Sequence, residues 1–294
     1  MGYSSKRGRR PVEYASRSSH SYVINDPSVK AFLDQCRLPV DVDQVDLSDH
    51  QIIEAPILEG NPIKHVIAVD GGYTEVAVRK EFPSSTLTFF QFGALIFSVE
   101  DLDEISQKPF IDPEDIAKLK NIQRIKLTLP TKNMSFKNEK SLVNSVRRTI
   151  FDFFLREPDE NSFMSTLKWF LFEEYSNGIN AWNLASCPEC RRPNIQLETK
   201  DMASDYTFRC ASCSGPIYLT DVFRLHEAVD NELGAGGVLG YISTLIEQII
   251  LVHLARVILM KRPDLLREIL FIKDGPLAFF GQTANMHRPM RNLG

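Results

Sequence analysis

Two apolar runs of this chain end in the same dipeptide, an arrangement that brings two carboxylates together if the runs are neighbouring strands. The run HVIAV precedes Asp70-Gly71, and the run ILFIK precedes Asp274-Gly275. Both runs predict buried strands. Asp-Gly after a strand is also common turn chemistry, so each pair alone fits a plain turn. If the two strands are parallel, their ends share one sheet edge and the aspartates lie roughly 5 Å apart.

Two carboxylates at that spacing repel each other unless a cation lies between them. Mg²⁺ and Mn²⁺ are hard ions that prefer oxygen ligands in proteins. Asp70 and Asp274 are therefore the first two candidate ligands of a divalent metal ion, and the site they form is a candidate catalytic site.

A third carboxylate falls on a predicted helix over residues 239–260. Glu247 shares a helical face with aliphatic residues at positions 251, 254 and 258. An ionised carboxylate without compensation loses on the order of several kcal/mol of solvation on such a face. It is then protonated, paired with a buried arginine, placed at a frayed helix edge, or bound to metal. The metal alternative makes Glu247 a third ligand beside the two aspartates.

Four of the five cysteines form two closely spaced pairs. They are Cys187-Pro-Glu-Cys190 and Cys210-Ala-Ser-Cys213, with nineteen residues between the pairs. This spacing is typical of a four-cysteine zinc site. Two disulfides are the competing interpretation, which a reducing cytoplasm disfavours. Four thiolates leave no coordination position for water, so we expect structural Zn²⁺ in a zinc ribbon.

The composition is that of an ordinary globular protein, with one large domain or one domain that carries a small insert. The chain has 294 residues, of which 43% are hydrophobic and 24% charged, and its formal net charge is −4. That charge gives no global attraction to nucleic acid. Any DNA contact must therefore come from a local basic face or from an assembled channel.

No membrane segment is expected from the sequence. The most apolar window, residues 245–260, is shorter than a spanning helix and carries Glu247, His253 and Arg256, which favours a core helix. The basic residues near the N-terminus are not followed by an apolar stretch, so we expect no secretory signal. These features predict a cytoplasmic protein without a membrane partner.

The order of the predicted elements suggests one core interrupted by the cysteine segment. We expect a flexible basic arm over residues 1–28, a first part of the core over 29–182, the zinc-ribbon insert over 183–218, and a second part of the core over 219–294.

The first part of the core is predicted to begin as an antiparallel meander. Strands are expected at 64–69, 74–79 and 86–99, with a turn at Gly71-Gly72. Residues 100–140 are expected to form a surface excursion that contains a short helix at 113–121.

Helices are predicted before, within and after these segments, and the last strand is predicted to lie parallel to the first. The expected helices cover 28–36, 141–155, 165–175 and 239–260, with a helix or hairpin at 219–232 and the last strand at 269–273. This order is that of a mixed-sheet α/β fold of the ribonuclease H-like type.

Three stretches resemble NurA-domain nucleases. They are SSHSYVINDP at 18–27, AVDGGY at 68–73 and FIKDGPL at 271–277. The chain is most similar to bacterial members that carry a cysteine zinc insert and are encoded beside the hexameric ATPase HerA. Members of this family continue well beyond the second Asp-Gly motif. The resemblance therefore implies a ribonuclease H-like nuclease core that is truncated at its C-terminal end.

The resemblance also implies an activity, partners and a ligand set. The activity is that of a Mn²⁺- or Mg²⁺-dependent DNA nuclease that processes DNA ends, in DNA repair or anti-phage defence. The implied assembly is a homodimer docked on a HerA-type ATPase that feeds it DNA. The metal-binding and catalytic residues carried over from the family are Asp70, Glu247 and Asp274.

Two other classes of function remain open at the level of sequence. One is a ribonuclease H-like ATPase, in which the two Asp-Gly turns bind nucleotide phosphates. The other is a non-catalytic subunit that uses the zinc ribbon and the long helices to regulate a ring ATPase.

Overall fold

The computed structural model describes residues 25–37, 44, 60–106, 123–156, 162–275 and 277–293. The chain divides into two units, Met1–Glu59 and Gly60–Gly294. The first unit contains helix α2 (Pro27–Leu33), whose N-cap Asp26 accepts a hydrogen bond from the amide of Ser28 at 2.8 Å. The predicted helix at 28–36 is present and slightly shorter than expected. Most of the predicted basic arm lies outside the described residues.

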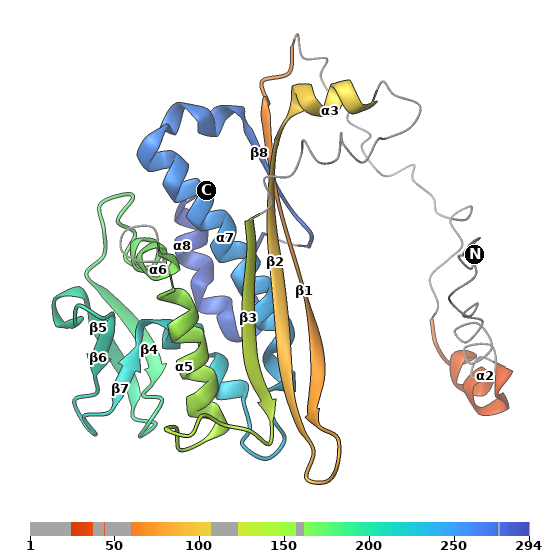
Figure 1. Ribbon diagram of the computed structural model, residues 1–294, viewed down its shortest axis with the longest axis vertical. Coiled ribbons are helices and arrows are strands. Elements are labelled where there is room, and N and C mark those ends of the chain that lie inside the picture. The colour runs from red at the N-terminus through yellow and green to blue at the C-terminus, as the bar shows by residue number, and fades with distance from the viewer. Residues whose placement is uncertain are drawn as a thin grey trace. The chain divides into compact units, whose positions relative to one another are not determined.

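The second unit is built on a four-stranded mixed sheet with the strand order β3-β2-β1-β8 (Figure 1). Strands β1 (His65–Arg79), β2 (Ser85–Ser98) and β3 (Gln123–Lys132) form an antiparallel meander. Strand β8 (Ile269–Lys273) lies parallel to β1. The predicted mixed α/β sheet, with its first and last strands parallel, is therefore present.

The predicted turn at Gly71-Gly72 is wrong. Strand β1 passes through both glycines without a break, and they pair with Phe92 and Gln91 of β2. The ladder with β2 supplies the backbone hydrogen bonds that a turn would have lost, so long-range pairing overrides the local turn preference. The strands expected at 64–69 and 74–79 are accordingly one element.

The prediction that residues 100–140 form only a surface excursion is also wrong in part. This stretch contains β3 and most of helix α3 (Val99–Ser106). The alternation of Arg124 and Lys126 with Ile125 and Leu127 fits a strand with one buried face, a pattern hidden by the charged flanks. The short helix expected at 113–121 lies outside the described residues.

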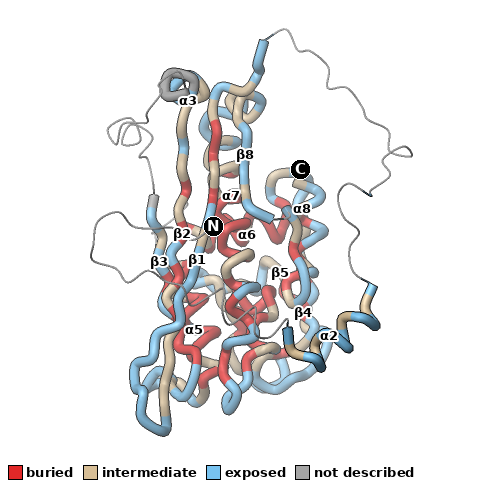
Figure 2. Tube along the Cα trace, turned by 90° about the vertical axis from the view of Figure 1, so that its right-hand side faces the viewer, coloured by how far each residue is buried: buried red, intermediate tan, exposed pale blue. Residues whose placement is uncertain are grey.

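Helices cover one face of the sheet (Figure 1). Helix α5 packs against β3 and helix α7 packs against both β1 and helix α6, and the buried segments gather between these elements and the sheet (Figure 2). The bounds of the four helices are α5 (Leu142–Phe154), α6 (Phe163–Leu171), α7 (Leu239–Lys261) and α8 (His287–Leu293). Ser141 and Ser162 cap α5 and α6 through their hydroxyls, which accept hydrogen bonds from backbone amides. The helices predicted at 141–155 and 239–260 are confirmed, and the helix predicted at 165–175 is present but ends at Leu171.

The segment predicted as a helix or hairpin at 219–232 is neither. It consists of short 3-10 turns separated by Arg224, whose φ of 59° breaks the helical path, and it ends in a bridge between Asp230 and Gly234. The 3-10 turns of the unit are η3 (Thr199–Asp201), η4 (Leu219–Phe223), η5 (Leu225–Ala228), η6 (Gly236–Val238), η7 (Pro263–Glu268) and η8 (Gly281–Met286).

The cysteine segment forms two small antiparallel hairpins. The first pairs β4 (Ala181–Ser186) with β5 (Pro193–Glu198), and the second pairs β6 (Thr207–Arg209) with β7 (Pro216–Tyr218). Each hairpin carries one cysteine pair at or beside its turn.

Helix α7 is longer than the apolar window considered above. Among the described residues, the segment Gly236–Lys261 is the one helix whose length and composition would allow it to cross a membrane. More than half of its most apolar window is buried inside the protein, at 56%. It therefore has the packing of a core helix, as its sequence predicted.

Candidate functional site

A cavity of about 550 Å³ lies at the carboxyl end of β8, and the three predicted carboxylates all line it. Asp70 comes from β1, Glu247 from α7, and Asp274 directly follows β8. The cavity is also lined by Lys273, which ends β8. Residues from three separate parts of the sequence therefore meet here.

The register of the two parallel strands sets the positions of the aspartates. Val69 pairs with Lys273 in the last matched position of β1 and β8, so Asp70 and Asp274 follow at the same edge. Both aspartates are exposed. Strand β8 ends here while β1 continues, and the edge of β1 beyond this point is not paired with β8.

Asp70 and Glu247 approach the cavity from different faces of β1. Val69 is buried in the core, and Gly71 faces Phe92 and Glu247, so strand alternation places Asp70 on the opposite face. Among the described residues, the only group of three or more potential metal ligands within 4.8 Å of one another is the four cysteines. The three carboxylates thus line one cavity without converging on one point.

Glu247 forms a buried ion pair with Lys273. Its Oε2 lies 2.8 Å from Nζ of Lys273, and the two side chains are 11% and 2% exposed. The same Nζ donates a hydrogen bond to the backbone carbonyl of Asp274 at 2.7 Å. The expected pairing of Glu247 with a buried cation is therefore present, but the cation is a lysine. The feature of the sequence that could have indicated this pair is that Lys273 alternates with Ile269 and Phe271 along the strand, which places it on the same face as these apolar residues.

Gly71 allows Glu247 to approach the sheet. A Cβ at this position would lie 2.4 Å from the ring of Phe92 and 3.0 Å from Oε1 of Glu247. No larger residue fits there without displacing one of these neighbours. The glycine is thus required for the close contact between α7 and β1.

The four cysteines form a compact cluster of free thiols. Their sulfur atoms lie within 4.8 Å of one another, at 3.9 Å for Cys187 and Cys213 and 3.8 Å for Cys190 and Cys210. Tetrahedral zinc with Zn–S bonds of about 2.3 Å places its sulfur ligands about 3.8 Å apart. The cluster is therefore consistent with structural zinc, as the spacing predicted.

The two cysteine turns repeat the same backbone pattern. In each, the amide of the first cysteine donates to the carbonyl five residues later, and the amide four residues later donates back, at 2.8–3.0 Å. The residue that donates back is Arg191 in one turn and Ser214 in the other, with φ values of 59° and 56°. Because the two turns have the same backbone conformation, both pairs can present their sulfur atoms to a shared metal in the same geometry.

The electrostatic environment of the cluster differs between its members. The backbone amides of Cys213 and Ser212 lower the pKa of Cys210 to about 6, whereas burial raises the pKa of Cys187 to about 12. Cys210 is thus the more acidic of these two thiols, and the charge of a bound metal favours deprotonation of all four.

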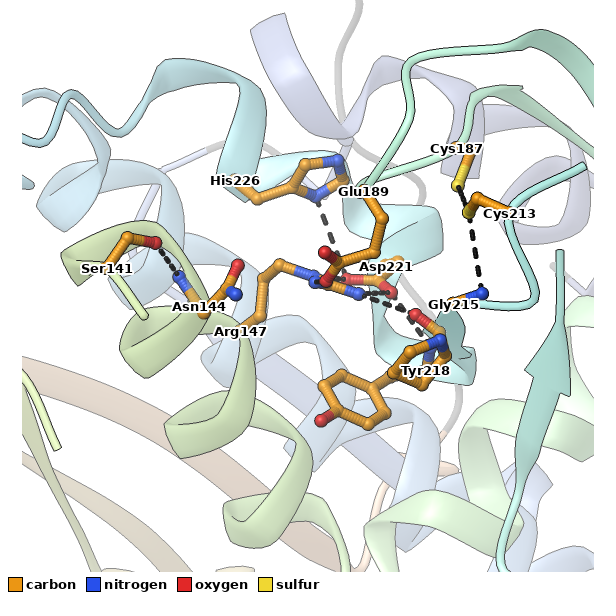
Figure 3. A network of polar contacts seen from close by, with 11 residues as sticks. Ser141, Asn144, Arg147, Cys187, Glu189, Cys213, Gly215, Tyr218, Asp221 and His226 are labelled. Carbon is orange, nitrogen blue, oxygen red and sulfur yellow. Dashed lines mark hydrogen bonds and ion pairs between the residues drawn. The ribbon is translucent and has the colours of Figure 1, made fainter. Parts of the chain in front are cut away.

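A buried arginine fastens the cysteine hairpins to the helical core (Figure 3). Arg147 of α5 binds both carboxylate oxygens of Asp221 at 2.9 and 2.8 Å, and Oε1 of Glu189, between the first two cysteines, at 2.7 Å. It also donates to the carbonyl of Pro216 at 3.1 Å and lies over the ring of Tyr218. Burial alone would lower the pKa of Arg147, but its ion pairs, above all with Asp221, outweigh burial and raise it.

Arg147 could not be singled out from the sequence, because nothing in the helical pattern of α5 distinguishes it from an exposed arginine. Arg147 and Arg148 are adjacent in the sequence, yet only Arg147 faces inward.

Comparison with known proteins identifies no family. The chain matches no protein-family model. No curated protein and no solved structure shows significant similarity to it. What stands is a mixed α/β fold with a four-stranded mixed sheet and a four-cysteine cluster on small hairpins. The ribonuclease H-like fold and the NurA resemblance stay predictions.

Proposed function

We propose that this protein is a divalent-metal-dependent DNA nuclease whose active site is the cavity at the carboxyl end of β8. The observation that carries the proposal is the parallel register of β1 and β8, which brings Asp70 and Asp274 to one edge of a cavity that Glu247 also lines. The ion is Mn²⁺ or Mg²⁺, because every carboxylate here offers oxygen ligands.

The charge and size of the cavity fit this assignment. Three carboxylates and one ammonium leave two negative charges, and within the described part of the chain neither aspartate forms an ion pair. Water occupies about 30 Å³ per molecule in the liquid. A cavity of about 550 Å³ therefore has room for a hydrated ion and a phosphodiester group.

The reaction would be hydrolysis of a phosphodiester bond by a water molecule. When bound, the ion would lower the pKa of that water and offset charge on the phosphoryl oxygens. Asp70 and Asp274 would hold the ion from β1 and from the end of β8. Glu247, held by Lys273, would keep α7 and the sheet in register at the cavity wall.

The proposed partners are DNA, a second copy of the chain and a HerA-type hexameric ATPase. They come from the family resemblance, as does a role in DNA repair or anti-phage defence. A cytoplasmic location is proposed from the sequence features described above. The net charge of −4 supports an assembly that guides DNA to the site, since the chain has no overall attraction for it. The four-cysteine cluster is assigned a structural Zn²⁺ in this scheme.

A second candidate is a non-catalytic zinc-ribbon subunit that regulates a ring ATPase. It is favoured by the contrast between the two sites, because the four thiols converge while the three carboxylates do not. Among the described residues, no observation of this kind favours the nucleotide-binding alternative.

A cleavage assay tests the proposal. Linear single- and double-stranded DNA is incubated with Mn²⁺ and the protein, with and without its partner ATPase. Asp70→Ala and Asp274→Ala should each reduce cleavage by at least about 100-fold, because each removes a ligand of the ion. Asp264→Ala, at an exposed position outside the cavity, is the control and should cleave normally. Cleavage that survives both cavity substitutions contradicts the proposed site.

A further inference from the structure

We propose that the ammonium of Lys273 is a fixed positive charge in the cavity lined by Asp70, Glu247 and Asp274, the carboxylate cavity. This charge limits the cavity to one divalent ion, held at Asp70 and Asp274. The inference deepens the proposed function and rests on it for the identity of the anionic substrate. Its statement about ion number can be tested without any substrate.

The first argument is the burial of the pair that Lys273 forms with Glu247. Their charged atoms are 2.8 Å apart, and the side chain of Lys273 is almost fully buried. Water and salt screen such a pair only weakly. A divalent ion that recruited Glu247 would leave the ammonium buried without its partner, which is strongly unfavourable. Glu247 is therefore committed to Lys273 and is not available as a ligand.

The second argument is that the ammonium is fixed from two sides. Lys273 is the last residue of β8 and is held by its pairing with Val69 of β1. Its Nζ also donates to the carbonyl of Asp274. The ammonium can therefore leave the cavity wall only by giving up both this hydrogen bond and its ion pair with Glu247.

The charges of the residues that line the cavity match those of one divalent ion. With Lys273 in place, the cavity holds two negative charges, which one divalent ion neutralises. Without the lysine charge, Glu247 becomes an unpaired carboxylate at the cavity wall and a second ion is favoured there.

The chemistry of Lys273 also suits an anionic substrate. The side chain of Lys273 is 2% exposed and its ammonium already has two acceptors, so it acts on a substrate through its charge and not through a direct hydrogen bond. Because Lys273 lines the cavity, this positive charge lies beside the place of a phosphate of the DNA backbone. Lys273 would then supply beside the phosphate the positive charge that a second ion supplies in two-ion sites.

The test counts bound Mn²⁺ by electron paramagnetic resonance in protein whose zinc content is measured separately. The wild-type chain should bind one Mn²⁺, and the double variant Asp70→Asn with Asp274→Asn should bind none. Lys273→Met, which keeps the length of the side chain and removes its charge, should raise the number to two. Lys273→Met combined with Glu247→Gln should return it to one.

Two controls separate a specific effect from a structural one. Lys64→Met removes a lysine from an exposed pair with Glu268 at the opposite end of β1 and β8, and it should leave the number at one. The double variant Lys273→Met with Glu247→Gln removes both members of the buried pair, so it leaves no buried charge unpaired and keeps the net charge of the cavity. It should bind one Mn²⁺ with an affinity close to that of the wild type, and it keeps the test valid if Lys273→Met alone does not fold.

The outcomes distinguish this inference from the proposed function. Two Mn²⁺ in the wild-type protein, no Mn²⁺ at all, loss of Mn²⁺ in the folded double variant Lys273→Met with Glu247→Gln, or a folded Lys273→Met that still binds one Mn²⁺ each overturns the inference. A wild-type protein that cleaves DNA and binds two ions overturns the inference alone. One Mn²⁺ that depends on the aspartates, in a protein that never cleaves DNA, supports the inference and contradicts the nuclease proposal.

Discussion

Lys273 lies at an inward position of an apolar strand, where a hydrophobic side chain would ordinarily pack against α7. Its ammonium instead meets Glu247 and the backbone of Asp274. Two isolated charges would each be costly in this position, and each makes the other tolerable. At the scale of single residues, the charge inside the cavity therefore depends on which face of its strand each residue occupies. The adjacent positions 71 and 72 allow this to be tested, because they lie on opposite faces of β1.

Gly71→Ala should destabilise the protein by about 1–3 kcal/mol, because the added Cβ collides with the ring of Phe92 and crowds Glu247. Urea unfolding followed by circular dichroism measures this. Gly72→Ala is a matched control, since a Cβ there meets nothing within 4 Å. Equal stability of the two variants would show that α7 does not approach β1 at Gly71.

A second pair of neighbours, Arg147 and Arg148, gives a sharper comparison. Arg147→Met leaves Asp221 buried without its main cation, and we expect a loss of about 3–5 kcal/mol in the free energy of unfolding. Arg148→Met breaks an exposed pair with Asp152 and a cation–π contact with the ring of Phe151, and it should cost about 1 kcal/mol. The same denaturant titration compares them. Similar costs would contradict the inward position of Arg147.

At the scale of elements, the contact between α6 and α7 is built around a histidine. His253 of α7 lies 2.8 Å from the hydroxyl of Thr166 in α6 and packs edge-on against Phe163. Burial, with a smaller contribution from Arg256, lowers the pKa of His253 to about 4 from its usual 6.5. In the folded protein His253 is therefore a neutral imidazole at the contact between α6 and α7.

This contact predicts how stability depends on pH. Between about pH 6.5 and pH 4 the unfolded chain binds a proton at His253 and the folded chain does not, so the free energy of unfolding should fall as the pH falls through this range. His253→Gln should flatten this part of the profile. His287→Gln, at an exposed position of α8, should leave it unchanged. Thermal melts at a series of pH values measure all three proteins, and parallel profiles for wild type and His253→Gln would refute the assignment.

At the scale of the whole molecule, the second unit combines two candidate metal centres that differ in kind. The cysteine cluster is closed, because four thiols leave no ligand position for a substrate. The carboxylate cavity is open and charged. Arg147 joins the cysteine hairpins to α5, so the stability of the cluster is coupled to that of the core.

Removal of the proposed zinc ligand tests this coupling. Cys190→Ser should reduce the zinc content from about one ion per chain to nearly none and should lower the melting temperature, since metal binding contributes to folding. Elemental analysis and thermal melts measure both effects. Cys36→Ser, in the other unit, should keep the zinc. A wild-type protein without zinc would contradict the assignment of the cluster.

The sequence alone predicted the parts of the fold that depend on local patterns. The helical periodicity of α5, α6 and α7 and the spacing of the cysteines are each set by neighbours in the chain. The parallel pairing of β1 with β8 followed from the order of the elements. Strand β3 was missed, because its flanks are charged and its pairing with β2 is not a local property.

The sequence by itself determined which residues carry charge, thiol or apolar surface, and where those residues recur with helical or strand spacing. Only the tertiary structure decided that β1 passes straight through Gly71, that Asp70 and Glu247 lie on different faces of that strand, and that Lys273 meets Glu247. These outcomes depend on contacts between segments up to about two hundred residues apart, and the free energy of burying a charge is set by whichever partner the fold brings to it.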